Sequence, residues 1–302
     1  MPTTEAVDLT GRTPRGQAAS GGGCLMVFSL PFLAVGPGIA WLVTTNPEGA
    51  NVPLPVVYGF ASLFSLAGLL VFIGGVRASI RRYRNNQQRR AHPEQPWRAD
   101  YTWNERGDRD RPFAKAVSGL VGMALFALFL APFNWFLWME RHPILIIVVG
   151  IFDLCLIAGV GFWLYDIGRS LKYGAGWIQY ERFPFFLGER LDVRLGCRGR
   201  LDRFEKVIVT VRFVRERQQS SRSGNSSQTT TLCRQHWAER LEFDPRVLRG
   251  ASDLPVSIEL PTGDYATRLS DTPARYWEVE MQGVAPGIDF ESRFLVPVYG
   301  RG

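Results

Sequence analysis

The sequence predicts a membrane α + β protein, with four transmembrane helices in two hairpins followed by an antiparallel β-sandwich. Three observations predict this fold class. Four long stretches in the first half carry almost no charge, the loops between them differ sharply in basic residues, and the second half changes to short alternating apolar runs. A chain of 302 residues has room for two such domains.

Each of the four apolar stretches is long enough to cross a bilayer, since a helix needs roughly 20 apolar residues to span the hydrocarbon core. The stretches cover residues 24–45, 56–76, 116–138 and 144–165, and only the last contains a charged residue, Asp153. Because backbone groups in lipid must be hydrogen-bonded internally, such stretches are helical. We therefore expect a transmembrane domain over residues 24–173, preceded by a disordered Gly/Ser-rich tail over residues 1–23.

The loops between the spans predict the orientation. The connection between the first two spans has no Lys or Arg, whereas the loop over residues 77–115 has eleven. The positive-inside rule places this loop in the cytoplasm. Four spans then place both termini on the same side, so we expect a multi-pass protein of the bacterial inner membrane with cytoplasmic N- and C-termini. The net charge of +7 lies largely in this loop, and without a nucleic-acid-binding motif we expect no nucleic-acid partner.

The start of this loop continues the second helix as a basic juxtamembrane segment. Its arginines include Arg81, Arg82, Arg84, Arg89 and Arg90. Such clusters are attracted to anionic lipid headgroups by about 1 kcal/mol per charge. The alternative is that these arginines only set the membrane topology, which is the usual role of such a charge bias.

Three aromatic residues follow in a Pro-punctuated stretch, Trp97, Tyr101 and Trp103. Aromatic side chains at this density usually dock on another surface. That surface is either the bilayer or the protein's own β domain, or it belongs to a partner protein, because exposed apolar patches often mark interfaces.

The half of the chain over residues 174–302 predicts short half-buried strands. Val207, Val209, Val211 and Phe213 alternate with polar residues, and similar runs recur between Gly- and Pro-containing turns. Strands without intervening helical periods indicate an antiparallel β-sandwich. The stretch over residues 217–231 lacks any apolar side chain, so we expect a long flexible hairpin loop there.

Four segments of this half look like arrestin-type sandwich domains: Phe185 to Leu191, Leu254 to Pro261, Tyr276 to Met281 and Phe294 to Val298. The joined architecture, with the Pro-Trp stretch ahead of the third span, resembles bacterial inner-membrane proteins of unknown function. The resemblance implies an arrestin/immunoglobulin-like fold and a binding habit, with no catalytic residues to carry over.

Asp153 is the acidic residue deep in a predicted span, and an intramembrane carboxylate is by default a functional hypothesis. It could carry a proton or a cation. Alternatively it is a protonated carboxyl hydrogen-bonded between helices, with Asn134, Ser62, Ser65 or Ser118 as candidate partners.

Metal, cofactor and catalytic chemistry have no signal in the sequence. The four cysteines form no CxxC pair, and the three histidines lie in separate predicted regions. No Gly-rich phosphate loop follows a predicted strand, and no nucleophile, base and acid lie in a triad-like arrangement. We therefore expect no enzyme activity and no cofactor.

These patterns favour a non-enzymatic, membrane-anchored binding or assembly module, whose cytoplasmic sandwich engages a protein partner while the helices contact the lipid bilayer. Strand addition at a sheet edge is a common way for such a domain to bind. The alternative is a small transport or channel-like component that uses Asp153 within the membrane, and a homo-oligomer is compatible with either.

Overall fold

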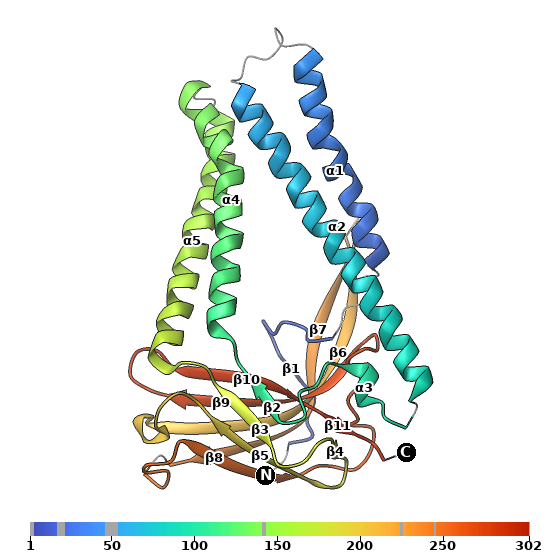
Figure 1. Ribbon diagram of the computed structural model, residues 1–302. Coiled ribbons are helices and arrows are strands. Elements are labelled where there is room, and N and C mark those ends of the chain that lie inside the picture. Colours follow the sequence, from blue (N-terminus) through green and yellow to red (C-terminus); the bar gives the residue numbers. More distant parts are fainter. Residues whose placement is uncertain are drawn as a thin grey trace. The chain divides into compact units, whose positions relative to one another are not determined.

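A computed structural model describes residues 3–16, 22–45, 54–92, 94–140, 143–223, 226–244 and 246–301. The chain divides into two compact units, whose elements are labelled in Figure 1. A helical unit contains Ser20–Arg84 and Phe113–Ile167. A β-rich unit contains Met1–Ala19, Asn85–Pro112 and Gly168–Gly302.

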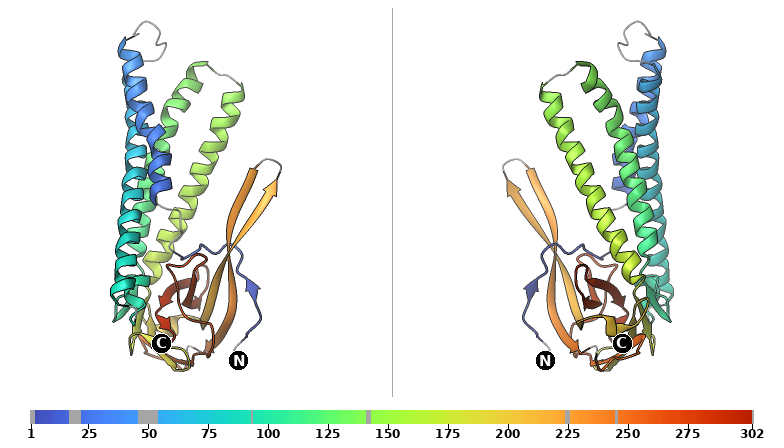
Figure 2. Two further views of the ribbon diagram at one scale, coloured as in Figure 1. Left: turned by 90° about the vertical axis from the view of Figure 1, so that its right-hand side faces the viewer. Right: turned by 90° about the vertical axis from the view of Figure 1, so that its left-hand side faces the viewer.

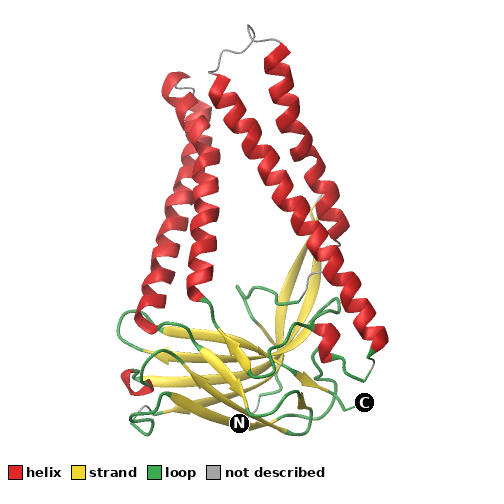
Figure 3. Cartoon of the chain, viewed as in Figure 1, coloured by secondary structure: helices red, strands yellow, loops and turns green. Residues whose placement is uncertain are grey.

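Within the described residues, four long helices make up the helical unit, and Figure 3 draws them in red. They are α1 (Gly22–Thr45), α2 (Leu54–Ala91), α4 (Pro112–Glu140) and α5 (Pro143–Tyr173), the ends of α2 and α5 belonging to the β-rich unit. Each contains a window long and apolar enough to cross a membrane. The predicted four apolar helices, paired as two hairpins, are confirmed. The Pro- and Gly-rich first span forms one helix that continues through Pro31 and Pro37.

Small residues and aromatic rings hold the helices together. A Cβ added at Gly36 of α1 would lie 2.4 Å from the carbonyl oxygen of Ala61 on α2, so only glycine permits this close approach. Between the hairpins, the ring of Phe129 on α4 lies 6.0 Å from the rings of both Phe60 and Phe64 on α2.

The described part of the β-rich unit contains two larger antiparallel sheets and one parallel strand pair. The five-stranded sheet has the order β1 (Val7–Asp8), β7 (Ser226–Phe243), β6 (Lys206–Ser223), β9 (Arg275–Val284), β10 (Phe290–Val296). The four-stranded sheet has the order β2 (Gly107–Arg109), β3 (Trp177–Tyr180), β5 (Arg190–Gly196), β8 (Asp253–Glu259). The parallel pair is β4 (Phe185–Phe186) with β11 (Val298–Tyr299), and short helices are α3 (Trp97–Asp100) and η2 (Leu201–Arg203).

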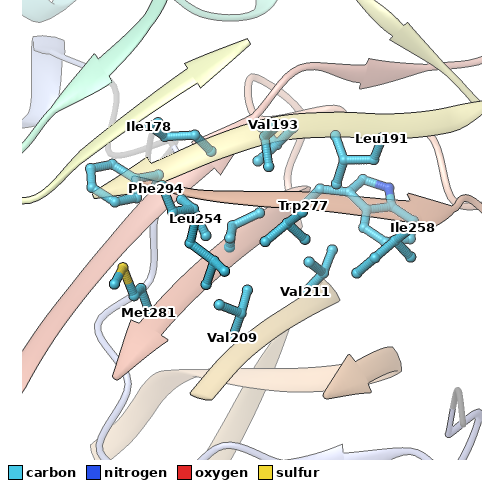
Figure 4. Close-up of a cluster of buried hydrophobic side chains, with 14 of the residues drawn as sticks. Ile178, Leu191, Val193, Val209, Val211, Leu254, Ile258, Trp277, Met281 and Phe294 are labelled. Atoms are coloured by element: carbon cyan, nitrogen blue, oxygen red, sulfur yellow. The ribbon is translucent and has the colours of Figure 1, made fainter. Parts of the chain in front are cut away.

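One hydrophobic core collects side chains from both larger sheets, as the close-up in Figure 4 shows. Val209 and Val211 of β6 and Trp277 of β9 are fully buried there. They meet Leu191 and Val193 of β5 in the same cluster. The period-two pattern of the sequence therefore predicted these inward-facing residues correctly, because alternate side chains of a strand point to one face.

The β-rich unit extends beyond the expected limits of residues 174–302. The N-terminal segment, expected as a disordered tail over residues 1–23, adds strand β1 to the edge of β7, with Val7 opposite Gln235. The loop between the hairpins adds β2 to the edge of β3, with Asp108 opposite Ile178. Strands of two or three residues are too short to show alternation, so neither strand is detectable from its own sequence pattern.

The end of α5 also belongs to this unit. Tyr173 is buried in the hydrophobic core, and its hydroxyl donates a hydrogen bond to the carbonyl of Ile288. The Lys172 ammonium donates to the Pro286 carbonyl at 3.1 Å, and the Arg203 guanidinium lies 5.0 Å from the centre of the Tyr173 ring. The last turn of the helix is therefore fixed by side chains of the β-rich unit.

Candidate functional site

The longest hairpin of the β-rich unit extends as a two-stranded ribbon beyond the other strands of its sheet (Figure 2). Pairing of β6 with β9 ends at Arg215, and β1 pairs with β7 only at Arg234 and Gln235. Within the described residues, no third strand pairs with residues 217–223 or 226–232. The expected flexible loop is thus a hairpin whose strands continue almost to the turn, and among the described residues no third strand pairs with either of its two edges.

A buried ionic cluster lies on the face of the five-stranded sheet opposite the hydrophobic core. Glu278 and Glu280 point away from the core because they alternate with the apolar residues of β9. The Arg12 guanidinium bridges them, with one nitrogen 2.8 Å from a Glu278 oxygen and the other 2.8 Å from a Glu280 oxygen. Arg212 pairs with both carboxylates, and Arg293 pairs with Glu280 at 3.0 Å.

Both carboxylate side chains of this cluster are almost fully buried, at 4% and 2% exposure. Burial also lowers the pKa of Arg212 to about 10, while the carboxylate of Glu278 acts in the opposite direction. The Arg212 guanidinium therefore stays protonated near neutral pH. Because buried charges are tolerated only when paired, each arginine of the cluster compensates a carboxylate that would otherwise be strongly destabilising.

The N-terminal segment covers this region of the sheet. The backbone N–H groups of Arg15 and Gly16 donate to one Glu216 oxygen at 2.8 and 2.7 Å. Leu9 packs against a small cluster that contains Cys233, and the Cys233 thiol lies 3.9 Å from the carbonyl oxygen of Arg12. Burial raises the pKa of the Cys233 thiol. The segment thus closes over side chains that solvent would otherwise reach.

Asp100 of α3 is a second buried anchor. Its carboxylate accepts hydrogen bonds from the backbone N–H groups of Leu269 and Ser270 at 3.0 and 2.9 Å, from the Ser270 hydroxyl at 2.6 Å and from the Tyr299 hydroxyl at 3.1 Å. These bonds fix the loop between the hairpins to the β-rich unit. Burial and the adjacent carboxylate raise the pKa of the Tyr299 hydroxyl, which therefore remains a donor.

The three aromatic residues of this loop contact the chain's own β-rich unit. The ring of Trp97 lies 6.2 Å from Phe186 and 5.9 Å from Tyr299, and the Trp103 indole N–H donates to the Tyr299 hydroxyl at 2.9 Å. Tyr101 and Trp103 both pack against the cluster that includes Cys233. All three side chains are half-buried by these contacts.

The basic end of α2 is exposed at Arg81, Arg82, Arg84 and Arg90. Arg89 differs, because its guanidinium donates to the Ser270 hydroxyl and lies 3.1 Å from an Asp271 oxygen. One arginine of the predicted headgroup cluster is thus tied to the β-rich unit, while the others face outward.

In the helical unit, the half-buried side chain of Asp153 on α5 connects this helix to α4. One of its carboxylate oxygens accepts a hydrogen bond of 3.0 Å from the side-chain amide of Asn134. Asn134 is among the partners that the sequence suggests, whereas Ser118 donates its hydroxyl to the carbonyl of Lys115 in its own helix. A groove of about 500 Å³ in the same unit is lined by apolar side chains such as Phe32, and it contributes no polar path.

Neither buried anchor was expected from the sequence. Glu278 and Glu280 occupy outward positions of a strand, which normally means solvent, and Asp100 lies in a polar loop. The one available signal is that two carboxylates share a face with Arg212 on the neighbouring strand. Among the described residues, no group of three or more His, Cys, Asp and Glu side chains could hold a metal ion.

Comparisons with known proteins add little to this geometry. No family model and no curated protein matches the chain. Among solved structures, the sporulation control protein Spo0M from Bacillus subtilis is similar at 12% identity, over 41% of this chain and 48% of that one, with a TM-score of 0.23. The chain thus spans about half the length of Spo0M, and a TM-score this low supports no conclusion about fold or function.

Proposed function

We propose that the protein is a non-enzymatic membrane-anchored binding or assembly module, whose β-rich unit engages an extended segment of a partner protein. The observation that carries this proposal is the β6–β7 ribbon, with whose two strands no third strand of the described chain pairs over residues 217–223 and 226–232. Unpaired backbone groups along a strand are a template on which another strand can form.

The composition of the ribbon supports this role. It contains Ser, Thr, Gln and Arg side chains and no apolar residue before Leu232. An isolated two-stranded ribbon is only marginally stable in water, and a third strand adds a second ladder of hydrogen bonds. Seven residues of strand offer an edge of roughly 23 Å, enough for a short extended peptide.

Membrane anchoring comes from the four apolar helices, each long enough to span a bilayer. The charge bias of the loop after α2 favours a cytoplasmic location for the β-rich unit at the bacterial inner membrane. The outward-facing arginines of α2 are suited to contacts with anionic headgroups, which would hold this end of the helix near the surface. We assign the β-rich unit to an arrestin/immunoglobulin-like sandwich, since its two antiparallel sheets share one core.

The experiment compares three forms of the full-length protein by affinity purification in mild detergent with mass spectrometry. In the shortened form, Gly224 and Asn225 join Arg217 directly to Leu232, and this keeps the register because those two residues are paired. In the control form, the ribbon keeps its length and composition but has a scrambled order. Strand addition through the backbone predicts partners with the native and scrambled ribbons and none with the short one. Partners that the short form retains, or the absence of partners throughout, would refute the proposal.

A further inference from the structure

The hydrogen-bonded pair of Asn134 and Asp153 lies deep within the apolar part of its helix hairpin. Asp153 comes ten residues after the start of α5 at Pro143, which is about 15 Å along the helix axis at 1.5 Å per residue. Asn134 comes six residues before Glu140, the end of α4, or about 9 Å from that end. Both groups therefore lie within the apolar stretches 116–138 and 144–165, which are long enough to cross a hydrocarbon core about 30 Å thick.

This pair has hydrogen-bonding capacity left over. The Asn134 amide donates to Asp153 at 3.0 Å and to the Leu130 carbonyl at 3.4 Å, which occupies donors only. Among the described residues, neither the side-chain oxygen of Asn134 nor the second carboxyl oxygen of Asp153 accepts a hydrogen bond. Asn134 is exposed and Asp153 half-buried, so these groups face the exterior of the helix pair. Lipid tails offer neither donors nor acceptors, so exposure to lipid alone would leave them unsatisfied.

We propose that the α4–α5 hairpin binds a second copy of the same chain in the membrane, with Asn134 and Asp153 of each copy hydrogen-bonded to those of the other. The pair is self-complementary, because the amide of each copy provides both donors and an acceptor and the carboxyl oxygens of each copy provide further acceptors. A two-fold axis along the membrane normal brings identical groups together at identical depth, which an unrelated helix would match only by chance.

The surface of α5 beside Asp153 suits close helix packing. Gly150 and Gly161 are exposed, and a Cβ added at either would meet no atom within 4 Å. Ile157 is 68% exposed and lies between them at spacings of seven and four residues, which place all three on one side of the helix. Small residues at such positions let two transmembrane helices approach closely enough for interhelical hydrogen bonds. This inference is independent of the proposed partner of the ribbon.

The test counts protein copies by single-molecule photobleaching of labelled full-length protein in liposomes at high lipid excess. We expect dimers for the native protein and about tenfold weaker dimerisation for Asn134→Leu and for Asp153→Leu, the scale of two lost interhelical hydrogen bonds. Asp153→Asn retains donors and acceptors and should remain dimeric, as should the control Ser118→Ala, whose hydroxyl bonds within its own helix.

A second measurement covers the possibility that the leucine variants disturb the hairpin itself. With Cys24 and Cys155 replaced by serine, Ile157→Cys should form an intermolecular disulfide under oxidation. Phe152→Cys is the control, because that ring contacts Phe126 of α4 at 6.3 Å. A monomeric native protein would overturn the proposal and leave lipid as the occupant of this face. Dimers that tolerate both leucine variants, or equal cross-linking at both cysteine positions, would overturn it as well.

Discussion

Replacing Arg12 with alanine should loosen the N-terminal segment from the sheet. The substitution leaves Glu278 and Glu280 buried with only Arg212 and Arg293 as counter-charges. Breaking a buried ion pair by removing one partner costs about 3–5 kcal/mol. Because two arginines remain in the cluster, we expect the lower end of this range, about 3 kcal/mol.

Cys233 supplies the assay. Its thiol is 2% exposed and lies beneath the N-terminal segment, so a thiol reagent reaches it only when the segment opens. If opening and closing are fast relative to labelling, the rate follows the population of the open form. A loss of about 3 kcal/mol then accelerates labelling roughly 100-fold, since each 1.4 kcal/mol is a factor of ten. Mass spectrometry of the labelled peptides in detergent-solubilised full-length protein measures this rate.

Two controls make the result specific. Cys197 is buried elsewhere, in the hydrophobic core, and its labelling reports opening of the whole unit. Arg15→Ala removes the same charge from the same segment, but its side chain is exposed and its backbone N–H bond to Glu216 survives. Unchanged labelling of Cys233 in the Arg12 variant would show that the ion pairs do not hold the segment. Equal acceleration at Cys197 would show that the effect is global.

Three further substitutions test other contacts of the β-rich unit. Asp100→Ala leaves the buried backbone N–H donors of Leu269 and Ser270 without an acceptor, so we expect the stability of this contact to fall by about 2–4 kcal/mol. The loop should then open more often, which limited proteolysis would detect as faster cleavage within residues 94–110. Burial lowers the pKa of His236, so as the pH falls below about 6.5 the imidazole takes up a proton in the unfolded state before it does in the folded state, and the free energy of unfolding decreases. The His236→Gln variant should show a smaller decrease in melting temperature between pH 7.5 and pH 5 than the native protein. An unchanged pH profile would contradict this expectation. Gly283→Ala places a methyl group 2.6 Å from the Phe204 ring and should lower stability by about 1–3 kcal/mol in the same melting assay, whereas an unaltered melting temperature would show that the ring moves freely.

The sequence predicted the parts of this fold that a simple physical constraint decides. Nearly uncharged stretches of about 20 residues have only the helix available in lipid, so the four long apolar helices follow directly. Alternation predicted the strand around Val209 in the same way. The sequence could not predict β1 and β2, because a strand of two or three residues is selected by the edge it completes and not by its own pattern.

The buried anchors were beyond prediction for a related reason. Arg12 and Glu278 are 266 positions apart, and nothing local to either residue indicates the other. The ribbon was expected as a loop because its side chains are all polar, yet cross-strand hydrogen bonds need only backbone, and residues 217–223 find partners across the turn. Asn134 could be named as a candidate hydrogen-bond partner of Asp153 only because the four apolar helices contain few polar residues.

The discontinuous make-up of the β-rich unit has a consequence for biosynthesis. Val7 cannot meet Gln235 until more than 200 further residues have been made, which takes roughly 10–50 s at ribosomal speeds. A helix hairpin long enough to cross a bilayer, as each of the two between the three contributing stretches is, returns the chain to the side it left when both helices cross. A hairpin in which only one of the two helices crossed would leave one stretch on the opposite side of the bilayer from the others, and the β-rich unit could not then be completed.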